Sequence, residues 1–299
     1  MSIDTEPHDH EQTRGNFPVL ILPRPSHIFL DRSRRFAALA HGHSLADWLI
    51  FLGRLTQVQH VLLQEYQSHL PPDEAAQDFA RKQHLPPISA LSQSHDHAWR
   101  QALTCLAREM APHAPPPARE ALEKLQTMDG PLLETLADRV LLAELDGEGA
   151  DLLPFIAAAL QVHWTALAAG LNGTEIAPLG MQSTCPCCGY LPVAGVIRVD
   201  GDVARLRYLH CALCNTEWHL VRVTCAACLD GNSIAYYHIE DSDGSVRAET
   251  CDSCRNYLKI VSREKSPQAD PVADDLATLG LDLHAQEMGY ARMSPNLLF

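Results

Sequence analysis

The sequence predicts an α+β protein, in which a helical N-terminal domain precedes two tandem β modules and a C-terminal helix. Three observations predict this class: helical periodicity of apolar residues over 28–172, nine of the ten cysteines within residues 185–254, and strand-like segments with turn signals between those cysteines. We therefore divide the chain into five parts: a disordered tail (1–20), a helical domain (21–180), a first module (181–222), a second module (223–265), and a C-terminal helix with its own tail (266–299).

The helical domain begins after an acidic opening, MSIDTEPHDHEQ, which lacks the features of a secretory signal. Apolar residues recur at helical spacing from Trp48 to Leu63 and predict a helix over 44–68. A helix over 149–171 is apolar on nearly every face, which predicts a central position. Consecutive prolines separate the shorter helices, which are predicted over 73–83, 95–111, 117–128 and 131–145. A last helix is predicted over 271–289.

The cysteines form four C-x-x-C pairs. A gap of 22 residues separates the first pair from the second and also the third from the fourth, and the second set repeats the first forty positions later. This repetition indicates an internal duplication. Two C-x-x-C turns can close a tetrahedral site of four sulfurs with no open position, and similar spacings are typical of zinc sites. We predict two metal sites, with the ligands Cys185, Cys188, Cys211 and Cys214 in the first and Cys225, Cys228, Cys251 and Cys254 in the second.

Two other uses of these cysteines are disfavoured. The absence of a secretory signal favours a location in the cytosol. Disulfides are disfavoured because they are rare in that reducing compartment. A thioredoxin-like dithiol needs one C-x-x-C pair rather than four. Of the cysteines outside the two sets, Cys187 is expected to be a small thiol that is not a ligand, and Cys105 is expected to lie in the core.

The number of ligands does not separate iron from zinc, because both metals accept four thiolates in a tetrahedron. The first turn, CPCCG (185–189), has the C-P-x-C-G form of rubredoxin loops, in which proline stiffens the turn and glycine permits a positive φ. We therefore expect rubredoxin-like or zinc-ribbon-like modules, with iron favoured and zinc as the alternative.

Each module is predicted to contain a β-hairpin. The segments 192–199 and 205–212 flank an Asp-Gly turn, and 233–240 and 246–252 repeat this plan. Residues 217–224 are predicted to form a strand that connects the modules. A module of forty residues is too small to fold on apolar burial alone. Metal binding contributes roughly 10–16 kcal/mol in comparable sites, so we expect it to determine whether each module folds.

Charge and motif content disfavour several functions. Residues 181–265 carry 9 Lys+Arg and 10 Asp+Glu, so the modules lack the basic face of a zinc ribbon that binds nucleic acid. The chain has no G-x-S-x-G, P-loop, G-x-G-x-x-G or H-E-x-x-H motif, and we predict that it is not an enzyme. No segment reaches the roughly 20 uninterrupted apolar residues of a membrane span. We expect a cytoplasmic protein without membrane insertion, and a homodimer is left open.

Four segments carry a family resemblance: CPCCGYLPVAGVI (185–197), RYLHCALCNTEWHLVRVTCAAC (207–228), CDSCRNYLKIVSREK (251–265) and VADDLATLGLDLHAQEMGYAR (272–292). In this order they resemble the formate dehydrogenase accessory protein family, FdhE, closely over 184–299 and more loosely over the helical part. In the second module, Leu229 and Arg255 stand where a rubredoxin-like loop has glycine.

The resemblance implies a non-catalytic cytoplasmic protein that binds the catalytic subunit of respiratory formate dehydrogenase and is needed for its assembly or activity. It also implies iron in rubredoxin-like sites formed by the eight cysteines given above. A rubredoxin-like electron carrier or redox sensor is the alternative function, and a zinc ribbon that binds nucleic acid is a weaker one.

Overall fold

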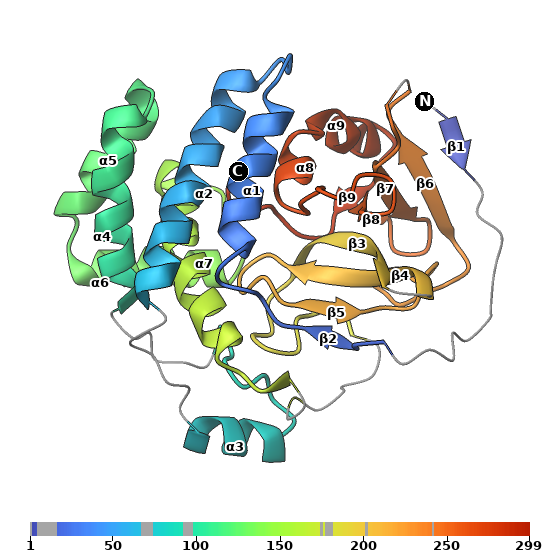
Figure 1. Cartoon of the computed structure of the whole chain (residues 1–299), viewed down its shortest axis with the longest axis horizontal. Coiled ribbons are helices and arrows are strands. Elements are labelled where there is room, and N and C mark those ends of the chain that lie inside the picture. Colours follow the sequence, from blue (N-terminus) through green and yellow to red (C-terminus); the bar gives the residue numbers. More distant parts are fainter. Residues whose placement is uncertain are drawn as a thin grey trace.

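The computed structural model places the N-terminal helices on one side of a mixed β-sheet, with the C-terminal helix α8 beside α1 and α9 next to strand β7 (Figure 1). It describes residues 2–4, 17–66, 74–91, 98–173, 176, 182–200, 203–240 and 242–299. Most of the predicted N-terminal tail, most of the linker before the first cysteine and the turn after Asp200 lie outside these residues. The predicted α+β class is confirmed.

The helical part packs around α7, which is buried along nearly its whole length, as its apolar composition predicts. Helices α2, α4 and α6 all contact it. Residues Ala150–Ala169 are long and apolar enough to span a membrane, with a mean hydropathy of 1.5, but 83% of their apolar window is buried inside the protein, as in a core helix. The helices of this part are α1 (Ile28–Leu39), α2 (Ala46–Tyr66), α3 (Glu74–Lys82), α4 (Ala98–Met110), η1 (Ala111–His113), α5 (Pro116–Thr127), α6 (Gly130–Leu141), η2 (Ala150–Leu152) and α7 (Leu153–Ala169).

The two modules have the same strand plan, in agreement with the predicted duplication. The hairpin β3–β4 is followed by β5, and the hairpin β6–β7 is followed by β8. Among the described residues the sheet order is β1-β6-β7-β8-β3-β4-β5-β2, and β9 pairs with β8. The strands are β1 (Ser2–Asp4), β2 (Leu20–Ile21), β3 (Pro192–Asp200), β4 (Val203–Cys211), β5 (Glu217–His219), β6 (Ile234–His238), β7 (Val246–Cys251), β8 (Asn256–Ser262) and β9 (Ala291–Arg292).

A parallel pairing of β3 with β8 joins the modules into one sheet, with Gly195 opposite Ile260. Without a side chain on Gly195, the Cδ1 atom of Ile260 can pack directly over the backbone of β3, in the space that a Cβ atom would occupy. Arg207 on β4 and Glu249 on β7 also form a buried ion pair across the junction, at 2.6 Å. The modules therefore share a sheet and a core.

The structure corrects three element boundaries. The helix predicted over 131–145 ends at Leu141, just before Ala143 adopts a left-handed φ of 59°. The strand predicted over 217–224 ends at His219, and the helix predicted over 271–289 is divided into α8 (Ala273–Leu276) and α9 (Leu279–Glu287). The buried Lys259 ammonium lies at this division and donates hydrogen bonds to the backbone carbonyls of Asp275 and Thr278, at 2.6 and 3.2 Å. Because these two carbonyls accept hydrogen bonds from the side chain of Lys259 on β8, the helix is interrupted at this point and does not continue as a single piece.

Candidate metal centres

The four C-x-x-C loops bring the eight predicted ligands into two groups of four. In each group the sulfur atoms all lie within 4.8 Å of one another. The facing pairs are 3.4 and 3.5 Å apart in the first group and 3.6 and 3.7 Å apart in the second. These distances are close to the ~3.8 Å edge of a tetrahedron with metal–sulfur bonds of ~2.3 Å. They are much longer than the ~2.05 Å of a disulfide, and all ten cysteines are free.

Each loop is a tight turn stabilised by its own backbone. The amides of Cys185, Cys211 and Cys225 each donate to the carbonyl five residues further on, at 2.7–2.9 Å. Backbone N–H groups also point at sulfur, because Leu213 donates to the Cys211 Sγ atom and Ala227 to the Cys225 Sγ atom, both at 3.4 Å. Hydrogen bonds of this kind favour a thiolate over a thiol, and only the thiolate is a metal ligand.

The residue after the second cysteine of every loop adopts a left-handed backbone. The φ angles are 76° at Gly189, 60° at Asn215, 62° at Leu229 and 58° at Arg255. A side chain at such an angle costs roughly 1–2 kcal/mol. The second module therefore keeps the turn geometry of the first, although neither of its loops has a glycine at this position. The guanidinium of Arg255 stacks on the ring of Tyr290 at 4.0 Å, which helps to hold one of these strained positions.

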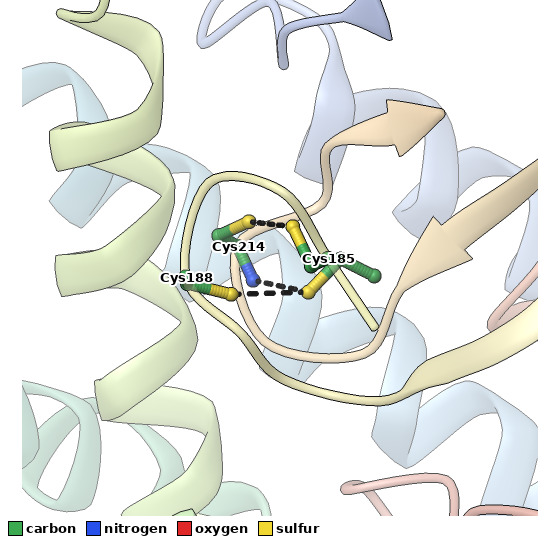
Figure 2. Close-up of side chains that lie close together, drawn as sticks. Cys185, Cys188 and Cys214 are labelled. Atoms are coloured by element: carbon green, nitrogen blue, oxygen red, sulfur yellow. Dashed lines mark hydrogen bonds between the residues drawn. The ribbon is translucent and has the colours of Figure 1, made fainter. Parts of the chain in front are cut away.

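The first site is enclosed by the helical part. Figure 2 shows its two loops meeting beside helix α7, from which Gln161 donates to the carbonyl of Ala212 at 2.8 Å. On another side, the amides of Ile88 and Ala90 donate to the carbonyls of Cys187 and Cys188, at 3.0 and 2.8 Å. All four sulfur-bearing residues of this site are buried.

Crowding in this enclosed site favours a cation. Burial, together with the neighbouring sulfurs, raises the pKa of Cys188 and of Cys211 well above the usual range. The reason is that a second thiolate in this site would lie close to another thiolate, with no solvent to screen the two negative charges. A divalent metal ion would remove this repulsion, since it binds all four sulfurs as thiolates. The residues present therefore fit a metal ion bound by four cysteines.

The second site lies at the protein surface. Cys225 and Cys251 are buried, but Cys228 is exposed and Cys254 is partly exposed. The two sites thus have the same loop geometry in different surroundings, one inside the protein and the other open to solvent on one side. Of the two cysteines outside the sets, Cys187 is buried beside the first site and Cys105 is partly buried against the helical core.

A buried polar network adjoins the first site through Asn215, which follows a predicted ligand. Arg32 of α1 is fully buried and donates to Asn215 at 2.8 Å and to Asp270 at 3.0 Å. His210 lies 3.1 Å from Asn215 and 3.3 Å from Glu217. No local motif in the sequence marks this network, because its members lie 178 to 238 residues from Arg32 along the chain.

Burial and charge oppose each other at Glu217. Burial alone would raise its pKa, but the hydrogen bond with His210 and the positive charges of Arg263 and Arg198 lower the pKa to about 2. Glu217 is therefore ionised at neutral pH, and it joins the first module to the loop after β8.

Comparison with known proteins agrees with this architecture along the whole chain. Three family models match in order: the FdhE N-terminal domain over residues 17–181, the FdhE central domain over 184–222 and the FdhE C-terminal domain over 223–299. The chain belongs to the FdhE family. The ranges matched by the central and C-terminal models each contain one set of four cysteines of this chain, which agrees with the resemblance predicted from the sequence.

Relatives and a solved structure match over nearly their full lengths. Protein FdhE from Escherichia coli O1:K1 is 34% identical over 302 residues, which cover 99% of this chain and 97% of that protein. Protein FdhE from Escherichia fergusonii matches to the same extent. The crystal structure of the FdhE protein from Pseudomonas aeruginosa matches with a TM-score of 0.83 and 34% identity, and it covers 94% of this chain and 99% of that one.

Proposed function

We propose that this protein is a non-catalytic, cytoplasmic accessory protein. In this proposal it binds the catalytic subunit of a respiratory formate dehydrogenase and is needed for the assembly or activity of that enzyme. The observation that carries the proposal is the match of all three FdhE models, in order, over nearly the whole chain. The four-sulfur geometry supports it, because a site closed by four protein ligands leaves no position for a substrate.

We further propose that the eight cysteines hold two metal ions, with iron favoured over zinc. The fit rests on the sulfur–sulfur distances and on the left-handed residue after every C-x-x-C pair, which is the turn expected of rubredoxin-like loops. When bound, each ion would link the two ends of a module, and the ion of the first site would also hold its loops beside helix α7. The helices and modules would then present one rigid surface to the partner.

A redox carrier or sensor is the second candidate, and the partial exposure of the second site favours it. Iron bound by four thiolates exchanges one electron, and exposed cysteines at that site would bring the ion close to a redox partner. Reversible reduction of a visible iron–thiolate band in the purified protein would support this function. A colourless protein loaded with zinc would exclude it.

The main proposal is tested by co-purification. The tagged protein should enrich the formate dehydrogenase catalytic subunit from cell extract, and a strain lacking the gene should lose formate dehydrogenase activity. Cys188→Ser and Cys228→Ser test each metal site, and Cys187→Ser is the matched control because Cys187 lies outside both sulfur groups. Normal enzyme activity in the deletion strain, with no enrichment of the catalytic subunit, would refute the proposal.

A further inference from the structure

A cavity of about 610 Å³ lies where three parts of the chain meet. Its walls come from α1 and the segment that leads into it, from the edge of the first module and from the loop after β8, so each of the three family domains contributes to it. Volumes of this size are typical of sites that bind organic ligands, and they are far larger than an inorganic ion needs.

Positive charge is concentrated around this cavity. Five arginines line it and a sixth, Arg32, is hydrogen-bonded to two of its lining residues. Four carboxylates lie among them, which leaves an excess of two positive charges in a chain whose net charge is −14. The lining arginines are Arg24, Arg34, Arg35, Arg198 and Arg263, and the carboxylates are those of Asp31, Glu217, Asp270 and Asp274.

The buried carboxylates use their oxygens within the protein. Glu217 accepts hydrogen bonds from Arg198 at 2.7 Å and from Arg263 at 3.3 Å. Asp270 accepts from Arg32 at 3.0 Å and from the backbone amides at the start of α8. An arginine has five N–H donors, and these contacts use one on Arg198. Arg198 and Arg263, whose side chains are 30% and 23% exposed, form the less exposed side of the cavity, which we call its floor. Further donors of Arg198 are therefore available there to a ligand.

Two more arginines stand at the rim. Arg24 is exposed and forms no ion pair with any residue that the structure describes. Arg34 is 70% exposed and contacts Asp31 at 3.6 Å, a solvated pair that contributes little to stability. Apolar side chains of Ile21 and Leu22 line the same cavity. The cavity thus offers charged donors at its rim and floor, with an apolar wall beside them.

We propose that this cavity binds an acidic peptide segment of a partner protein. Guanidinium groups bind carboxylates in a planar, two-point geometry, and the positive excess would attract such a segment to a protein that is otherwise acidic. Carboxylates of the segment bind the rim and floor arginines, and an apolar side chain between them packs on Ile21 and Leu22. Such binding depends on the cavity alone, whichever protein supplies the segment.

The test is fluorescence anisotropy on the full-length, metal-loaded protein. The probe is a labelled peptide, Gly-Glu-Leu-Glu-Gly-Tyr, with blocked ends, and its neutral match replaces both glutamates with glutamine. We expect the acidic peptide to bind at least tenfold more tightly than the neutral one, and to bind more weakly as salt rises. Combining Arg24→Gln with Arg34→Gln should weaken binding about tenfold, because two exposed charges are lost without disturbing the core.

The control variant is Arg108→Gln, which removes an exposed arginine of α4 whose side chain is 68% exposed and lies outside the cavity lining. It should bind like the wild type. Three results would overturn the proposal: equal binding of the acidic and neutral peptides, equal affinity of the rim double variant and the control, or displacement of the peptide by inorganic phosphate at equal concentration. None of these results depends on whether a formate dehydrogenase subunit co-purifies, so this proposal and the proposed function fail separately.

Discussion

Replacing Glu217 by glutamine removes the buried carboxylate that joins the first module to the loop after β8. Its pKa falls from an ordinary 4.5 to about 2 in the folded protein. Since a tenfold change in proton affinity corresponds to about 1.4 kcal/mol, the ionised carboxylate contributes about 3 kcal/mol to the stability of the folded state at neutral pH. Glu217→Gln should lose most of this, because it leaves Arg198, Arg263 and His210 without their shared anion.

The assay is urea unfolding of the metal-loaded protein at pH 7, with Glu264→Gln as the matched control. Glu264 forms an ion pair with Arg205 at 3.1 Å, but both side chains are exposed, so the control should lose less than about 1 kcal/mol. The folded-state pKa of Glu217 is lowered, so its contribution is fully present above about pH 4.5 and is lost as the pH falls towards about 2. Equal losses for the two variants at pH 7 would refute this reasoning.

Three further predictions concern the metal sites and the junction between the modules. A chelator should remove the ion of the second site quickly and that of the first site at least a hundredfold more slowly, because only the second site has an exposed ligand, Cys228. Elemental analysis over time checks this, and equal rates of loss would contradict it. Cys187→Ala should keep two ions per chain whereas Cys188→Ala should keep one, as metal analysis of the purified variants would show. Arg207→Met should cost about 3–5 kcal/mol in urea unfolding, because it removes the cation that is paired with the buried carboxylate of Glu249. A loss under about 1 kcal/mol would contradict this.

The sequence was sufficient to predict the parts of the protein that depend on local patterns. The C-x-x-C spacing predicted which four sulfurs would lie together, because two short turns joined by a hairpin have few ways to meet. The forty-residue offset predicted the repeated strand plan, and the apolar composition of 149–171 predicted the central helix α7. Each of these features is encoded within one continuous segment.

Contacts between distant segments were not predictable in the same way. The pairing of β3 with β8 places Gly195 opposite Ile260, and a glycine within a strand pattern does not indicate which strand it faces. The left-handed angles at Leu229 and Arg255 run against the preference of those residues and are imposed by the loops around them. The burial of Arg32 has the same origin, because its partners come from the modules and from the loop before α8.

The parallel strand pair has a consequence for synthesis on the ribosome. Gly195 of β3 is made well before Ile260 of β8, since 64 residues lie between them in the chain. During that interval the first hairpin has one unpaired edge, and exposed edges of this kind attract other chains. Ribosomes stalled before β8 should therefore carry a nascent chain that aggregates. In the complete chain, β8 pairs with the free edge of β3 and covers it.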